Sequence, residues 1–84
     1  MLAEVEKARL KWRCRRGMLE LDLFFAKFID NYLAKLTEAE SEDFAKFLEN
    51  PDPTLYAWFM GYETPEDEVS IRFVEIIRSC NQVA

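Results

Sequence analysis

Helix breakers are scarce in this sequence and lie only at the edges of amphipathic stretches. The 84 residues include two glycines and three prolines, each at a place where a helix would start or stop. Between these residues, apolar side chains recur at helical spacing, and no useful length of β-alternation appears. The sequence therefore predicts an all-α protein.

The positions of these glycines and prolines predict five helices, over residues 3–14, 19–35, 37–50, 52–60 and 64–80. The second is the longest and has the broadest apolar face, so it should be the central helix. Short connections force sequential helices to lie side by side. We expect a compact antiparallel bundle that forms one domain over residues 1–84, because a chain this short buries only about 60% of its unfolded surface.

Several helix ends have recognisable capping signals. Thr37 and Glu40 form a T-x-x-E capping box at the start of the third helix. Asp52 and Thr64 each precede a proline, which predicts an N-cap followed by proline at the first helical position. Gly61 is well placed to leave the fourth helix in a left-handed conformation.

Side-chain spacing also predicts which faces pack. In the first helix Val5, Ala8 and Trp12 form a narrow apolar stripe among charges. In the fifth helix, apolar positions at helical spacing place Cys80 inside the packed face. Trp58, on the short fourth helix, is expected to be mostly buried.

Composition excludes several classes of protein. Half of the residues are hydrophobic and 14% are aromatic, which argues against global disorder. Cys14 and Cys80 lie far apart without a C-x-x-C spacing, so they indicate neither a disulfide framework nor a zinc site. No apolar run is long enough to span a membrane, and the N-terminal residues include acids. We expect a cytoplasmic protein without direct membrane insertion.

The net charge of −5 conceals a strong asymmetry along the chain. Residues 1–18 carry six bases and two acids, whereas residues 19–84 carry five bases and fourteen acids. This local basic cluster suggests a site and leaves a small nucleic-acid-binding domain as one alternative. The acidic remainder argues against that alternative, because it repels phosphate.

The junction of the first two helices is the most unusual stretch, with the sequence RCRRGMLELD over residues 13–22. One interpretation is structural: arginines neutralise the carbonyl end of the first helix, Gly17 ends it, and acids favour the start of the next. Another is functional. Arg15 and Arg16 offer bidentate donors, and the glycine beside them permits close approach of a partner.

The segment CRRGMLELD resembles the R-G-x-x-E motif of the succinate dehydrogenase assembly factor family, the small flavinylation factors of bacteria and mitochondria. The resemblance extends over most of the chain. It also includes Arg9 and Trp12 upstream of the motif, and Leu36, Thr37, Glu40, Phe44, Leu48, Asp52, Leu55, Trp58, Gly61 and Pro65 downstream.

This resemblance implies a five-helix assembly factor that binds the flavoprotein subunit of succinate dehydrogenase or fumarate reductase. It also implies that the factor promotes covalent attachment of FAD to a histidine of that subunit. The residues expected to bind the partner are the motif (Arg16, Gly17 and Glu20), its flanks (Arg15 and Asp22) and the upstream Arg9. Leu19, at a variable position of the motif, is assigned no role.

Independent catalysis is not expected, because the chain has no histidine and no familiar catalytic motif. Cys14 is the best candidate nucleophile, but a helix C-terminus opposes its thiolate and a structural cysteine is the favoured interpretation. Without a G-x-G-x-x-G segment, we expect no stable FAD binding by the chain itself. We expect a monomer when the protein is free. An antitoxin-like or general protein-interaction module stays open, since members of the resembled family have also been described as antitoxins.

Overall fold

The computed structural model describes residues 4–81, which form five α-helices and one 3₁₀ helix. Their bounds are α1 Glu4–Arg13, α2 Leu19–Tyr32, η1 (the 3₁₀ helix) Leu33–Lys35, α3 Glu38–Phe47, α4 Asp52–Met60 and α5 Glu68–Cys80. The prediction of an all-α fold with five helices is confirmed. The second helix differs slightly from expectation, because its last turn tightens into η1.

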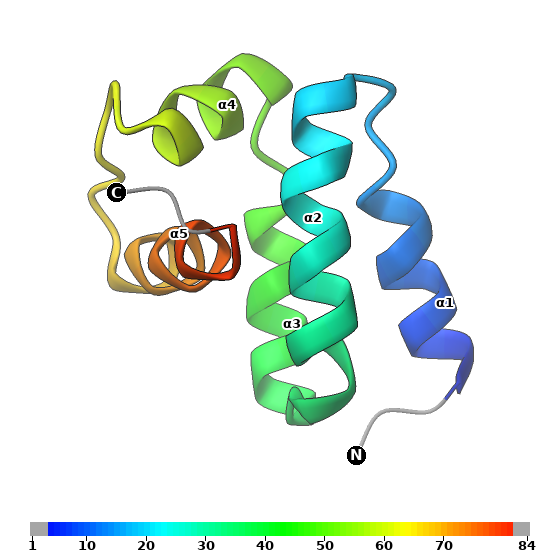
Figure 1. Ribbon diagram of the computed structural model, residues 1–84. Helices are drawn as coiled ribbons and strands as arrows, with labels where there is room; N and C mark the ends of the chain where they lie inside the picture. The colour runs from blue at the N-terminus through cyan, green and yellow to red at the C-terminus, as the bar shows by residue number, and fades with distance from the viewer. Residues whose placement is uncertain (1–3, 82–84) are drawn as a thin grey trace.

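The first three helices run alongside one another in alternating directions, and this is the clearest antiparallel part of the bundle (Figure 1). Helix α5 is seen nearly end-on in the same view, so it crosses α2 rather than following it. Both α4 and α5 pack against α2, which is the central helix as expected. The start of α4 lies at the same end of the molecule as the α1–α2 loop (Figure 1).

Phenylalanine rings dominate the centre of the core. The rings of Phe28 and Phe44, from α2 and α3, have centroids 4.8 Å apart, and Phe73 of α5 lies 5.2 Å from Phe44. Such pairs add about 0.5–1.5 kcal/mol each to the stabilisation from burial alone. Phe25, Phe47 and Phe59 extend the same cluster, and all six rings are almost completely buried. This core holds α2 rigidly in place.

Two of the predicted helix ends are confirmed. Thr37 Oγ1 accepts a hydrogen bond from the Glu40 amide at 3.1 Å, and the Glu40 carboxylate accepts one from the Thr37 amide at 3.0 Å. These two bonds complete the capping box of α3. Gly61 ends α4 with a φ of 79°, the left-handed conformation that glycine adopts without strain.

The starts of the last two helices differ from expectation. Pro51 precedes α4, and Asp52 is already its first residue, without a capping hydrogen bond of its own. Helix α5 begins at Glu68 rather than near Thr64, because Asp67 caps it by accepting a hydrogen bond from the Ser70 amide at 2.9 Å. A carboxylate is a strong N-cap, so it competes successfully with the hydroxyl upstream.

The packed face of α1 was also predicted wrongly. Val5 and Trp12 are 61% and 71% exposed, whereas Leu10 and Cys14 are buried. Leu10 and Cys14 are four residues apart and therefore share one side of the helix, and Trp12 lies on the opposite side. The predicted stripe faces solvent as a result.

One of two expectations about burial is confirmed. Trp58 is mostly buried and stacks on Phe47, with ring centroids 6.1 Å apart. Cys80 packs at the end of α5 and is half-buried rather than enclosed. Among the described residues, no helix is long and apolar enough to cross a membrane.

Candidate functional site

The loop between α1 and α2 carries the R-G-x-x-E motif at one end of the bundle. Gly17 has a φ of +84°, and no heavy atom outside residues 16–18 lies within 4 Å of the place that a Cβ would occupy. Glycine is therefore required by the backbone conformation and not by a crowded surrounding. The space in front of Gly17 is open, so another surface can approach its backbone.

Arg16 points inward and fastens this loop to the corner between α3 and α4. Its Nε donates to Asp52 Oδ1 at 2.7 Å, its Nη1 to the Leu48 carbonyl at 2.9 Å, and its Nη2 to the Asn50 carbonyl at 3.0 Å. A further bond of 3.3 Å joins Nη1 to the Arg13 carbonyl. The side chain thus pairs with two carbonyls in the segment that follows α3, where no helical hydrogen bond satisfies them.

Asp22 belongs to the same arrangement. Its Oδ1 accepts a hydrogen bond from the Arg16 main-chain amide at 2.8 Å, so α2 fixes the backbone of the loop that precedes it. Both Arg16 and Asp22 were predicted to contact a partner. Their polar atoms are used inside the chain instead, which gives these two residues a role in shaping the loop. Direct contact between either residue and a partner stays a prediction.

Arg15 and Glu20, by contrast, are exposed. Within residues 4–81 neither side chain forms a hydrogen bond or an ion pair. Adjacent residues thus differ in role, since Arg16 is held inside and Arg15 extends outward. Glu20 lies in the first turn of α2, on the side that faces α4, where it lines a groove between the two helices.

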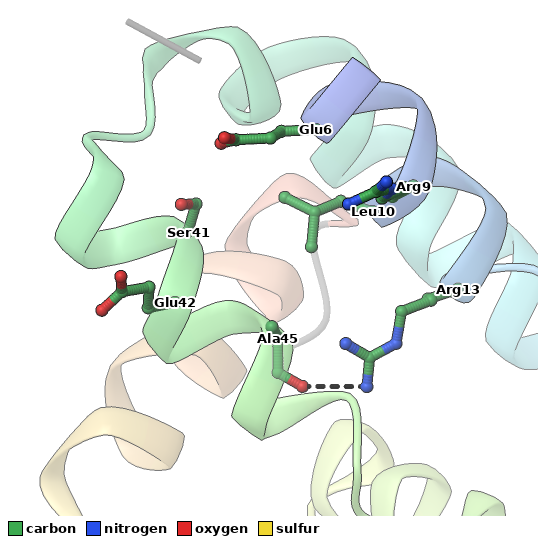
Figure 2. A pocket seen from close by; sticks show the side chains of 7 residues that line it. All are labelled: Glu6, Arg9, Leu10, Arg13, Ser41, Glu42 and Ala45. Carbon is green, nitrogen blue, oxygen red and sulfur yellow. Dashed lines mark hydrogen bonds between the residues drawn. The ribbon is translucent and has the colours of Figure 1, made fainter. Parts of the chain in front are cut away.

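Arg9 lies away from the loop, on the exposed side of a groove between α1 and α3 (Figure 2). Figure 2 shows Arg9 and Arg13 on the α1 side of this groove, facing Ser41 and Ala45 of α3. Arg13 donates to the Ala45 carbonyl at 3.1 Å and so ties α1 to α3. The structure therefore does not bring Arg9 together with the motif residues.

Exposed apolar side chains near the motif were missed by sequence reasoning. Trp12 is 71% exposed, Leu19 is 67% exposed and Leu23 is 58% exposed. Leu19 and Leu23 are four residues apart, on the side of α2 away from the buried Leu21 and Phe25. That spacing could have revealed a second apolar face. We use the name motif surface for the exposed residues Trp12, Arg15, Gly17 and Glu20.

Cys14 is unsuited to nucleophilic chemistry in this structure. Only 2% of the residue is exposed. Burial raises the pKa of its thiol to about 12 and outweighs the opposing effect of the nearby Arg16 and Arg13 charges. A neutral thiol is a poor nucleophile. The structural interpretation of Cys14 is therefore correct. Among the described residues, no group of three or more potential metal ligands gathers in one place.

Comparisons with known proteins agree on one family. The Sdh5 family, described as the flavinator of succinate dehydrogenase, matches residues 8–81. An FAD assembly factor SdhE from Legionella pneumophila strain Paris is 53% identical over 76 residues, covering 90% of this chain and 95% of that protein. The SdhE of Colwellia psychrerythraea is 47% identical over 76 residues, covering 90% of this chain and 84% of the relative.

A solved structure supports the same assignment. The solution structure of a UPF0350 protein superposes with a TM-score of 0.79 at 43% identity, covering 98% of this chain and 87% of the other. The helical fold and the relatives named FAD assembly factors agree. The chain belongs to the Sdh5 family of succinate dehydrogenase flavinators.

Proposed function

We propose that this protein binds the flavoprotein subunit of succinate dehydrogenase or fumarate reductase and promotes covalent attachment of FAD to that subunit. The observation that supports the proposal is the motif surface. Arg15 and Glu20 extend into solvent without partners in the described chain, beside a glycine whose surroundings are open. Polar groups that are left unused on a rigid scaffold are suited to pairing with another protein.

Each residue of the motif surface has a distinct part in the proposed contact. The guanidinium of Arg15 can bind a carboxylate through two donors, and the carboxylate of Glu20 can accept from an arginine. Gly17 lets the partner backbone come close. Trp12 adds a large exposed aromatic side chain, the residue type that most often anchors protein interfaces.

The protein promotes the reaction by positioning, and the reacting groups belong to the partner. FAD and the histidine that it modifies are both carried by the flavoprotein subunit in this proposal. A rigid bundle that holds one orientation of a mobile part of the subunit raises the fraction of time in which histidine and flavin are in reactive geometry. Arg16, Asp22 and Asp52 contribute by keeping the motif loop in one conformation.

Four further expectations complete the proposal. The protein is not itself an enzyme, since its one buried thiol near the motif is neutral and the chain has no histidine. It does not bind FAD stably on its own, and it is a monomer when free. The expected cytoplasmic location stays a prediction.

The proposal is tested by producing a flavoprotein subunit together with variants of this protein. Arg15→Ala and Glu20→Ala should each lower co-purification of the subunit and its covalent flavin content about tenfold or more, as loss of a central interface residue does. Glu75→Ala, an exposed acid on α5, is the matched control and should behave as the wild type. Wild-type flavin content with all three variants would place the functional surface elsewhere, whereas equal flavin content with and without the protein would favour the antitoxin-like alternative.

A further inference from the structure

A shallow groove of about 320 Å³ lies between α2 and α4, directly beside the motif loop. Its lining residues are Glu20, Leu23, Phe24, Tyr56, Met60 and Asn81. The volume is at the lower end of the range for sites that bind small ligands, about 300–1,000 Å³. The groove can therefore accept one large side chain of another protein.

The floor of the groove is firmly held. Phe24 packs on the buried Phe59, with ring centroids 5.1 Å apart. Asn81, at the end of α5, donates from its side-chain amide to the Phe24 carbonyl at 3.0 Å and to the Ile77 carbonyl at 2.8 Å. These contacts fix α2, α4 and α5 relative to one another. The groove is therefore a preformed feature, and its occupant does not have to open it.

Apolar surface and one negative charge are combined in this groove. Leu23 is 58% exposed, and Tyr56 and Met60 are half-buried. Glu20 is the only charged residue among those that line the groove. Glu20 and Leu23 are three residues apart, so they are neighbours on the surface of α2. An occupant that suits both features needs an apolar stem and a positive end.

We propose that this groove binds an arginine side chain of the flavoprotein subunit. The aliphatic part of the arginine lies along Leu23 and Met60, and its guanidinium pairs with Glu20. Arginine combines these two properties in one side chain, because its methylene stem packs on apolar surface while its planar head binds a carboxylate. Tyr56 adds an aromatic ring on which the guanidinium can stack.

This inference rests on the proposed function and adds a specific contact to it. Glu20 belongs both to the motif surface and to the groove, so the two are parts of one continuous surface. An anionic occupant such as a dinucleotide or nucleic acid is disfavoured, because Glu20 repels phosphate and no cation lines the groove.

The test introduces a competing arginine from within the chain. Leu23→Arg places a guanidinium three residues from Glu20, so it occupies the groove and neutralises the acid. Ala26→Arg is the matched control, because Ala26 is also exposed on α2 but does not line the groove. Both sites are exposed, and unchanged far-UV circular dichroism and thermal midpoints establish that both variants fold.

Binding to the purified flavoprotein subunit is then measured by titration. We expect Leu23→Arg to weaken binding about tenfold or more and Ala26→Arg to change it less than about threefold. Equal affinity of the two variants would overturn the groove assignment while leaving the proposed function intact. Failure of the wild-type protein to bind the subunit at all would overturn both.

A second measurement identifies the occupant without relying on a disruptive substitution. A photoreactive amino acid that replaces Met60 should cross-link to the flavoprotein subunit. The cross-linked peptide of the subunit should carry the link on an arginine or on its immediate neighbour. The same probe at Glu42, in the groove between α1 and α3, is the control. Cross-links from Met60 that map to acidic or arginine-free segments would contradict the proposal.

Discussion

Replacing Arg16 with alanine should destabilise the fold, whereas replacing the neighbouring Arg15 should not. The Arg16 side chain is 17% exposed and donates to the Leu48 and Asn50 carbonyls and to the Asp52 carboxylate. Arg15 is exposed and has no such bonds in residues 4–81. The two adjacent arginines therefore provide a natural pair of test and control.

The magnitude follows from the bonds that are lost. A hydrogen bond from a charged donor contributes about 1.5–3 kcal/mol, although bonds that share one donor group do not add fully. The ion pair contributes at most about 1 kcal/mol, because Asp52 is 35% exposed and solvent screens it. Water also reaches the carbonyls once the side chain is gone. We expect the free energy of unfolding to fall by about 2–3 kcal/mol, or the melting temperature by roughly 10–20 °C.

Urea unfolding followed by far-UV circular dichroism measures this difference. Arg15→Ala should lie within about 0.5 kcal/mol of the wild type, as is usual for exposed residues. Flavin attachment should show the opposite order. At a temperature where both variants are folded, Arg15→Ala should lower the covalent flavin content more than Arg16→Ala does, since Arg15 belongs to the motif surface. A loss below about 0.5 kcal/mol for Arg16→Ala would refute the inward role of Arg16.

Three further predictions concern the loop, the buried thiol and a helix cap. Gly17→Ala should destabilise the fold by about 1–2 kcal/mol in urea unfolding, because a side chain is strained at a φ of +84° even where space is open; an unchanged midpoint would contradict this. Burial raises the pKa of the Cys14 thiol to about 12, so Cys14 should resist alkylation at pH 8 until the protein unfolds. The more accessible Cys80 should react in the folded state. Mass spectrometry measures the labelling of the two cysteine peptides, and equal labelling in the folded protein would contradict this prediction. The hydrogen bond from the Ser70 amide lowers the pKa of Asp67 below its ordinary value of 3.8, so its stabilising effect is complete above that value and disappears as the pH falls through the lowered pKa. Asp67→Ala should therefore destabilise by about 1 kcal/mol at pH 7, and a difference that stayed constant as the pH was lowered through the titration of Asp67 would show that the carboxylate charge is not the cause.

Local signals in the sequence predicted much of the fold. The capping box of Thr37 and Glu40 and the glycine at position 61 were identified correctly because each depends on residues within one helical turn. The start of α5 was misplaced, because Thr64 was taken as the cap although Asp67 is the stronger N-cap residue and lies three residues further on. The relative strength of the two caps could have been read from the sequence.

The candidate site was predicted less completely, for a physical reason. The contact between Arg16 and Asp52 joins residues 36 positions apart, and no local pattern specifies it. Sequence reasoning therefore treated Arg16 and Arg15 alike, although one shapes the loop and the other faces solvent. Trp12 was assigned to the packed stripe because its spacing fits a helix face, and only the buried Leu10 shows which face packs.

Covalent flavin in a denatured flavoprotein subunit is the most direct measure of the central claim. The subunit is produced in cells that lack or contain this protein and is then examined by in-gel flavin fluorescence, because denaturation removes flavin that is not covalently bound. Our account predicts strong fluorescence only when the protein is present, and a large loss of that signal with Glu20→Ala but not with Glu75→Ala. Equal fluorescence with and without the protein would contradict the account.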